Sequence, residues 1–98
     1  MARTLSPEEA QDMAIAALGF VAGDDRLLPR FLAISGIEAS QIRAAAAEPG
    51  FLAGVLGFIL AHEPTLMAFC EARGIRPETV GAAQQALPGG DSRYEAST

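Results

Sequence analysis

The segment Phe51–Ala61 ("FLAGVLGFILA") constrains the fold of this 98-residue chain more than any other feature. As a helix it is apolar on every side, so it has no face for water and must be surrounded by other elements. It is far shorter than the roughly 20 residues that span a bilayer. We therefore expect a central buried helix. The alternative is that part of its surface forms a groove for a partner or a second subunit, because so short a chain has little else to cover it.

Start and stop signals elsewhere in the chain predict further helices. "SPEE" at Ser6–Glu9 combines a serine cap, a proline at the first helical position and a glutamate that can reach back to the cap. Gly23 ends this helix, and Asp24 or Asp25 caps a short one that stops at Gly36. A third helix follows in "EASQIRAAAAEPG" and ends at its proline and glycine.

Residues 13–48 align without a gap over residues 51–86, at an offset of 38 that places Gly36 over Gly74. Periods of this length are typical of a repeated supersecondary unit, although an alanine-rich chain also produces chance matches. The sequence therefore predicts an all-α, compact bundle of about six short helices, built as two similar three-helix units that a pseudo-twofold axis relates. One helical domain over 6–87 is expected, with flexible ends at 1–5 and 88–98. The identical pairs are Leu18/Leu56, Gly19/Gly57, Phe20/Phe58, Leu28/Leu66, Phe31/Phe69, Gly36/Gly74, Ile37/Ile75, Ala44/Ala82 and Ala45/Ala83.

The only histidine and the only cysteine, His62 and Cys70, are the obvious candidates for chemistry. In the repeat alignment Cys70 lies opposite Leu32 on a packed helix face, and His62 lies opposite Asp24 in a loop. A buried cysteine behaves as a small hydrophobe, and no third residue completes a catalytic set. Zinc needs about four ligands, more than these two residues provide. We expect no catalytic, cofactor-binding or metal-binding residues.

The charge of the chain argues against polyanionic partners. Its seven basic residues are all arginine and its formal net charge is -5. Although "PRFLAISGIEASQIRAAAA" has the outline of a helix-turn-helix, its second helix offers few groups for phosphate contacts. We therefore expect no nucleic-acid partner and no membrane partner. A single cysteine demands no oxidising compartment, and "MARTLSPEEAQD" does not read as a secretory signal, so the expected location is the cytoplasm.

What remains to support a function is apolar helical surface. The leading prediction is a non-enzymatic protein–protein interaction module whose partner is an unidentified protein or a second copy of the chain. The alternative is a carrier or sensor of a small apolar ligand held between the two helical units. The expected partner surface consists of Phe51, Leu52, Phe58, Leu66 and Met67.

Four segments also carry a resemblance to a known family: "ALGF" (17–20), "RFLAISGI" (30–37), "EPGFL" (48–52) and "LPGG" (87–90). With them the chain resembles a small family of cytoplasmic alphaproteobacterial proteins, the domain of unknown function 3572, over about residues 10–90. The resemblance implies a compact all-helical domain. It brings no known activity, cofactor or catalytic residue to carry over.

Overall fold

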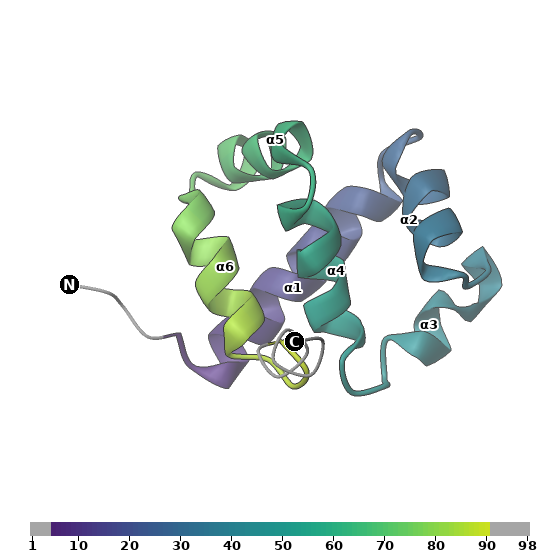
Figure 1. Ribbon diagram of the computed structural model, residues 1–98, viewed down its shortest axis with the longest axis horizontal. Coiled ribbons are helices and arrows are strands. Elements are labelled where there is room, and N and C mark those ends of the chain that lie inside the picture. Colours follow the sequence, from purple (N-terminus) through teal and green to yellow (C-terminus); the bar gives the residue numbers. More distant parts are fainter. Residues whose placement is uncertain (1–4, 91–98) are drawn as a thin grey trace, which may run out of the picture.

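A computed structural model of the chain describes residues 5–90. Within that range the chain forms six α-helices and one 3₁₀ turn and no strand, so the all-α prediction is confirmed (Figure 1). The elements are α1 (Pro7–Ala22), α2 (Leu27–Ser35), η1 (Ala39–Gln41), α3 (Ile42–Ala45), α4 (Phe51–Leu60), α5 (Glu63–Arg73) and α6 (Pro77–Gln85).

Most helix limits follow the local signals in the sequence, but the third predicted helix is wrong in extent: it is a 3₁₀ turn followed by the short α3, which ends at Ala45, before Pro49. Ser6 Oγ accepts from the Glu9 backbone N–H at 3.1 Å, and the Glu9 carboxylate accepts from the Ser6 N–H at 2.9 Å, which completes the predicted capping box. Asp24 Oδ1 accepts from two backbone N–H groups, at 2.8 and 3.0 Å, where the chain enters α2. Gly36 and Gly74 end α2 and α5 with φ of 79° and 68°, the left-handed conformation that favours glycine.

Helix α4 lies at the centre of the molecule, as its composition predicted, but it is not surrounded on every side, since Gly54 is exposed and Phe58 only half-buried. It packs against α1, α5 and α6, and α1 and α6 also pack against each other. Its fully or nearly fully buried residues are Ala53, Val55, Leu56 and Ile59. Helix α1 contributes mostly alanines to the same core (Ala10, Ala14 and Ala17, with Val21), and such small side chains let helix axes approach closely.

The packing of the two predicted three-helix units is not symmetric. At the offset of 38 residues the end of α4 corresponds to the end of α1, although α1 begins earlier, and Phe31 and Phe69 are both buried. However, α6 packs against α1 and α4, whereas its counterpart α3 has no comparable packing against either helix. No pseudo-twofold arrangement results, and the internal repeat stays a prediction from the sequence.

The two ends of the described range are packed against the domain. Leu5 contacts the core, and Gly90 is buried in a turn after α6. The rest of the predicted flexible ends, residues 1–4 and 91–98, lies outside the described residues. Among residues 5–90 no single helix is long and apolar enough to cross a membrane; α4 and α5 reach that length only together, and the chain bends by 106° between them.

Candidate functional site

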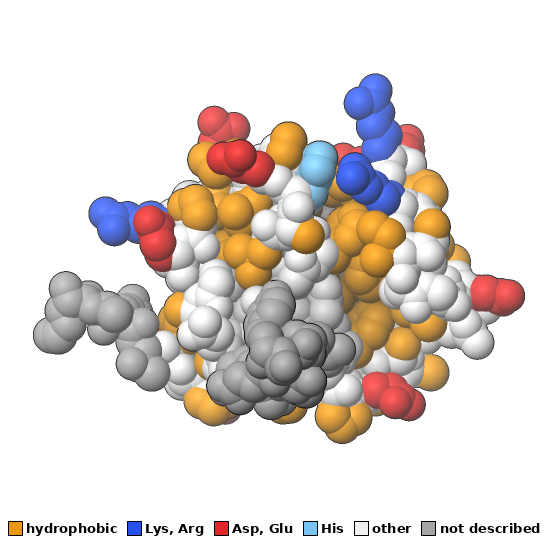
Figure 2. Space-filling view, in the orientation of Figure 1, with side chains coloured by type: hydrophobic (Ala, Val, Ile, Leu, Met, Phe, Trp, Pro, Cys, Tyr) orange, Lys and Arg blue, Asp and Glu red, His pale blue; other side chains and the backbone are white. Residues whose placement is uncertain are grey.

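An open groove of about 580 Å³ lies between α2 and α4. Figure 2 shows the apolar side chains that gather in it, with the histidine at one end. Helix α2 contributes Arg30, Phe31, Ile34 and Ser35 to the lining. Helix α4 and its flanking residues contribute Gly50, Phe51, Gly54, Gly57, Phe58, Ala61 and His62.

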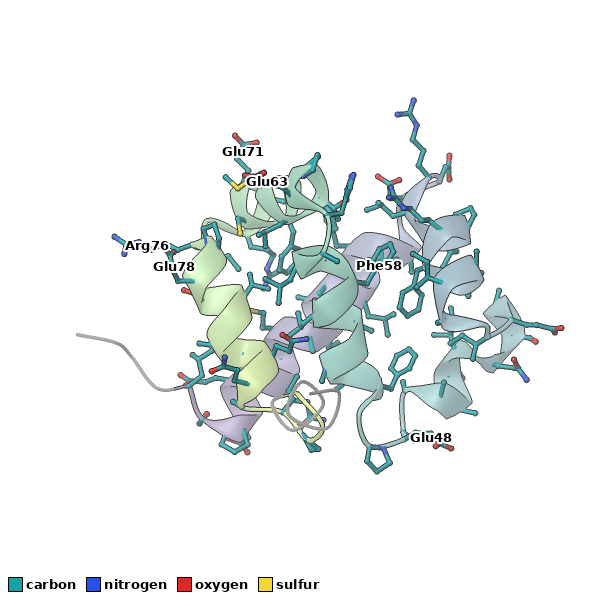
Figure 3. The ribbon with its side chains drawn as sticks, in the orientation of Figure 1. Glu48, Phe58, Glu63, Glu71, Arg76 and Glu78 are labelled. Carbon is teal, nitrogen blue, oxygen red and sulfur yellow. The ribbon has the colours of Figure 1, made fainter. Side chains whose placement is uncertain are left out.

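Three phenylalanines form the apolar wall of this groove. Phe31 is buried and meets Phe51 and Phe58 edge to face, with ring centroids 6.0 and 5.4 Å apart and interplanar angles of 85° and 79°. Phe51 and Phe58 are seven residues apart, so two turns of α4 bring both rings to the side on which they meet Phe31 of α2. Figure 3 shows Phe58 between α4 and α2. Edge-to-face contacts hold aromatic rings in defined positions. Beside this wall Ile34 is 69% exposed, so the apolar surface continues into solvent.

Glycines keep the α4 side of the groove open. A Cβ atom at Gly54 would meet no atom within 4 Å, and one at Gly57 would lie 2.9 Å from Gln84 Nε2. Gly50 precedes α4 with φ of 90° and also lines the groove. At Gly54 a bound segment can therefore approach the α4 backbone closely, whereas the Gln84 side chain fills the space beside Gly57.

The groove is free of carboxylates, although the chain as a whole has a net charge of -5. Arg30 and His62 are the ionisable residues that line it. The imidazole Nδ1 of His62 shares a 2.7 Å hydrogen bond with the hydroxyl of Thr65, a buried residue in the first turn of α5. This bond fixes the His62 ring at the end of the groove. An occupant with apolar character and a negative charge therefore suits the lining best.

Two of the five residues predicted as a partner surface come together in the groove. Phe51 and Phe58 line it, both half-buried. Leu52 points elsewhere and lines a separate depression near Leu87. The other two residues, Leu66 and Met67, lie on α5 outside the groove lining; Leu66 is half-buried and Met67 is 48% exposed.

The α2 side of the groove did not appear in the predicted partner surface. Phe31, Ile34 and Arg30 lie within one turn of α2, and their side chains reach the same hollow as those of α4. The spacing of Phe31 and Ile34 is a helical signal that could have identified them. What it could not show is that α2 would lie opposite the phenylalanines of α4, because that depends on tertiary packing.

The remaining candidate for chemistry, Cys70, is 4% exposed, in agreement with the expectation of a buried thiol. Burial raises the pKa of the Cys70 thiol above its usual value, and the negative charge of Glu78 raises it further. Both effects keep the sulfur in the unreactive thiol form. Among residues 5–90 no three histidine, cysteine, aspartate or glutamate side chains are grouped so that they could hold a metal ion.

Comparison with known proteins places the chain in a family. No curated protein and no solved structure matches it. The family described as "Protein of unknown function (DUF3572)" matches residues 7–90, which is nearly the whole domain from the start of α1 to the turn after α6. The chain therefore belongs to this family, DUF3572.

Proposed function

We propose that this chain is a non-enzymatic protein–protein interaction module that holds an apolar helix of a partner protein in the groove between α2 and α4. The observation that carries the proposal is an aromatic wall continuous with an isoleucine, Ile34, that is 69% exposed. Large aliphatic side chains next to an aromatic groove are typical of surfaces that a partner covers. Amphipathic helices use this mode of binding when they place their apolar face in a hydrophobic groove.

The shape and charge of the groove support a helix as the occupant. The glycine at position 54 leaves space for a side chain of the partner against the α4 backbone. Arg30 and His62 suit a partner helix that carries a carboxylate beside its apolar residues. A second copy of this chain is one candidate for the partner, and sedimentation velocity of the purified protein tests it directly.

A matched pair of substitutions tests the proposal. Ile34→Arg places a charge in the groove, whereas Ile15→Arg makes the same change at an isoleucine of α1 that is 51% exposed and does not line the groove. Both variants should keep the helical circular dichroism of the wild type. In affinity purification from the native host, Ile34→Arg should lose partners that Ile15→Arg retains. Equal recovery by the two variants would place the interaction elsewhere on the molecule.

The second candidate function is a carrier or sensor of a small apolar ligand. The groove volume of about 580 Å³ lies in the range of ligand pockets, roughly 300–1,000 Å³, and the groove separates helices of the two predicted units. The exposure of Ile34 argues against this function, because the groove is open beside it and a small ligand there would keep one side in contact with water. Native mass spectrometry of the purified protein distinguishes the two, because a carrier should retain a bound small molecule.

The proposal includes no catalytic step and no polyanionic partner. Cys70 is buried, and the imidazole of His62 is already hydrogen-bonded to Thr65. With a net charge of -5 the chain should not bind DNA or anionic vesicles at physiological salt, which gel shift and co-sedimentation assays check. We place its action in the cytoplasm, because its single cysteine demands no oxidising environment.

A further inference from the structure

The groove continues across α4 toward the C-terminal end of the described chain. A second hollow of about 280 Å³ is lined by Gly50, Ala53, Gly54, Gly57, Gln84, Gly89 and Gly90. Three of these glycines, at positions 50, 54 and 57, also line the groove between α2 and α4. The two hollows therefore share a face of α4 whose own residues are glycines, and the Gln84 side chain of α6 covers its edge at Gly57, where Nε2 donates to the Ala53 carbonyl at 3.3 Å. This face offers a path from Gly90 to the aromatic wall.

The point at which the chain enters this path is fixed. The Gly90 N–H donates to the Leu87 carbonyl at 3.0 Å, and Gly89 has a φ of 80°. A Cβ atom at Gly90 would overlap the Gln84 carbonyl, so the turn requires glycine there. Leu87, 7% exposed, anchors the turn to the core. Figure 1 shows this end of the described chain beside the N-terminal half of α4.

We propose that residues 91–98 ("DSRYEAST") of this chain cross the glycine face of α4 and place the ring of Tyr94 in the aromatic groove. Tyr94 is four residues beyond Gly90, a reach of about 14 Å for an extended chain, whereas a helix with its side chains is about 10 Å across. The ring can meet the phenylalanines edge to face. The segment carries two carboxylates, Asp91 and Glu95, against one arginine, Arg93, so its charge is negative overall, and the lining contains Arg30 and no acidic residue.

The consequence is competition at one site. This consequence rests on the proposed function: a partner helix must displace the chain's own C-terminal segment. The partner's apparent affinity is then its intrinsic affinity multiplied by the fraction of molecules whose groove is free. The position of Tyr94 itself does not depend on any partner. The segment can therefore be tested in the purified protein.

Tyrosine fluorescence gives a direct readout, because Tyr94 is the only tyrosine and the chain has no tryptophan. Acrylamide should quench Tyr94 severalfold less in the full chain than in a synthetic peptide of residues 91–98. Gly54→Leu fills the path and should restore quenching to the level of the peptide. Gly19→Leu is the matched control: both glycines are exposed, lie within helices and leave open space for a side chain. It should keep the protection of the wild type.

Three results would overturn the inference. Tyr94 quenched equally in the full chain and in the peptide would mean that the groove is not occupied by this segment. Equal protection in wild type and Gly54→Leu would place the ring elsewhere. Protection that disappears on dilution would assign the occupant to a second copy of the chain. If Ile34→Arg loses partners but Tyr94 is not protected in the full chain, only this inference is refuted. If Tyr94 is protected but Ile34→Arg keeps its partners, only the proposed function is refuted.

Discussion

Truncation of Phe69 to alanine should destabilise this domain more than truncation of Phe31, although the sequence alignment treats the two residues as equivalent. Phe69 is fully buried and packs edge to face on Phe20, with centroids 5.4 Å apart. Removal of a fully buried phenylalanine leaves a closed cavity and costs about 3 to 5 kcal/mol. The lost aromatic contact places this substitution toward the upper end, at about 4 to 5 kcal/mol.

Phe31 loses two aromatic contacts, but it borders the groove, where neighbouring rings and water can fill part of the space. Sites that relax in this way show the smaller costs, so Phe31→Ala should destabilise by about 3 kcal/mol. The predicted difference between the two variants is about 1 to 2 kcal/mol, and each kcal/mol corresponds to a difference in Tm of roughly 4 to 8 °C for a domain of this size. Total stabilities of small domains are about 5 to 15 kcal/mol, so Phe31→Ala should stay folded, whereas Phe69→Ala leaves little stability at the lower end of this range.

Urea unfolding followed by far-ultraviolet circular dichroism measures both costs, with Ile15→Ala as an exposed control that should change the free energy of unfolding by about 0.5 kcal/mol or less. The m-values should not change. Equal costs for Phe31→Ala and Phe69→Ala would support equivalence of the two units and refute the argument from the open groove. A larger cost for Phe31 would refute it more strongly.

Three further predictions concern local features. Ser6→Ala removes the acceptor for the Glu9 N–H and should lower the free energy of unfolding by about 1 kcal/mol, measured by urea titration. The pKa of Asp24 is lowered from 3.8 because its carboxylate accepts two backbone hydrogen bonds; its stabilising effect should be present above that pH and decline as the pH falls, and NMR titration should give a pKa below 3.8. Burial raises the pKa of the Cys70 thiol from 9.0, so stability should decline as the pH rises above 9.0, and a thiol reagent should label the native protein far more slowly than the denatured one. Labelling at equal rates would contradict the buried position of Cys70.

Local signals in the sequence predicted most of the helix limits and the helix that lies at the centre. Ser6, Gly36 and Gly74 set helix limits through hydrogen bonds and backbone angles that involve only residues within about one turn, so they can be read without knowledge of the fold. The all-round apolar character of Phe51–Leu60 correctly predicted a central helix, but the expected burial on every side was wrong, because the face toward α2 lines an open groove. The buried position of Cys70 followed from its place on a helix face.

The tertiary structure alone decided which helices meet. Nothing local to α3 and α6 indicates that α6 packs against α1 and α4 and that α3 does not, because this choice depends on how side chains from distant segments fit together. The same packing brings Phe31 and Ile34 of α2 opposite Phe51 and Phe58 and leaves the groove between them. The sequence identified one wall of the candidate site, since α4 had more apolar surface than its neighbours could cover. The opposite wall, formed by α2, exists only because tertiary packing leaves α2 apart from α4 with the groove between them.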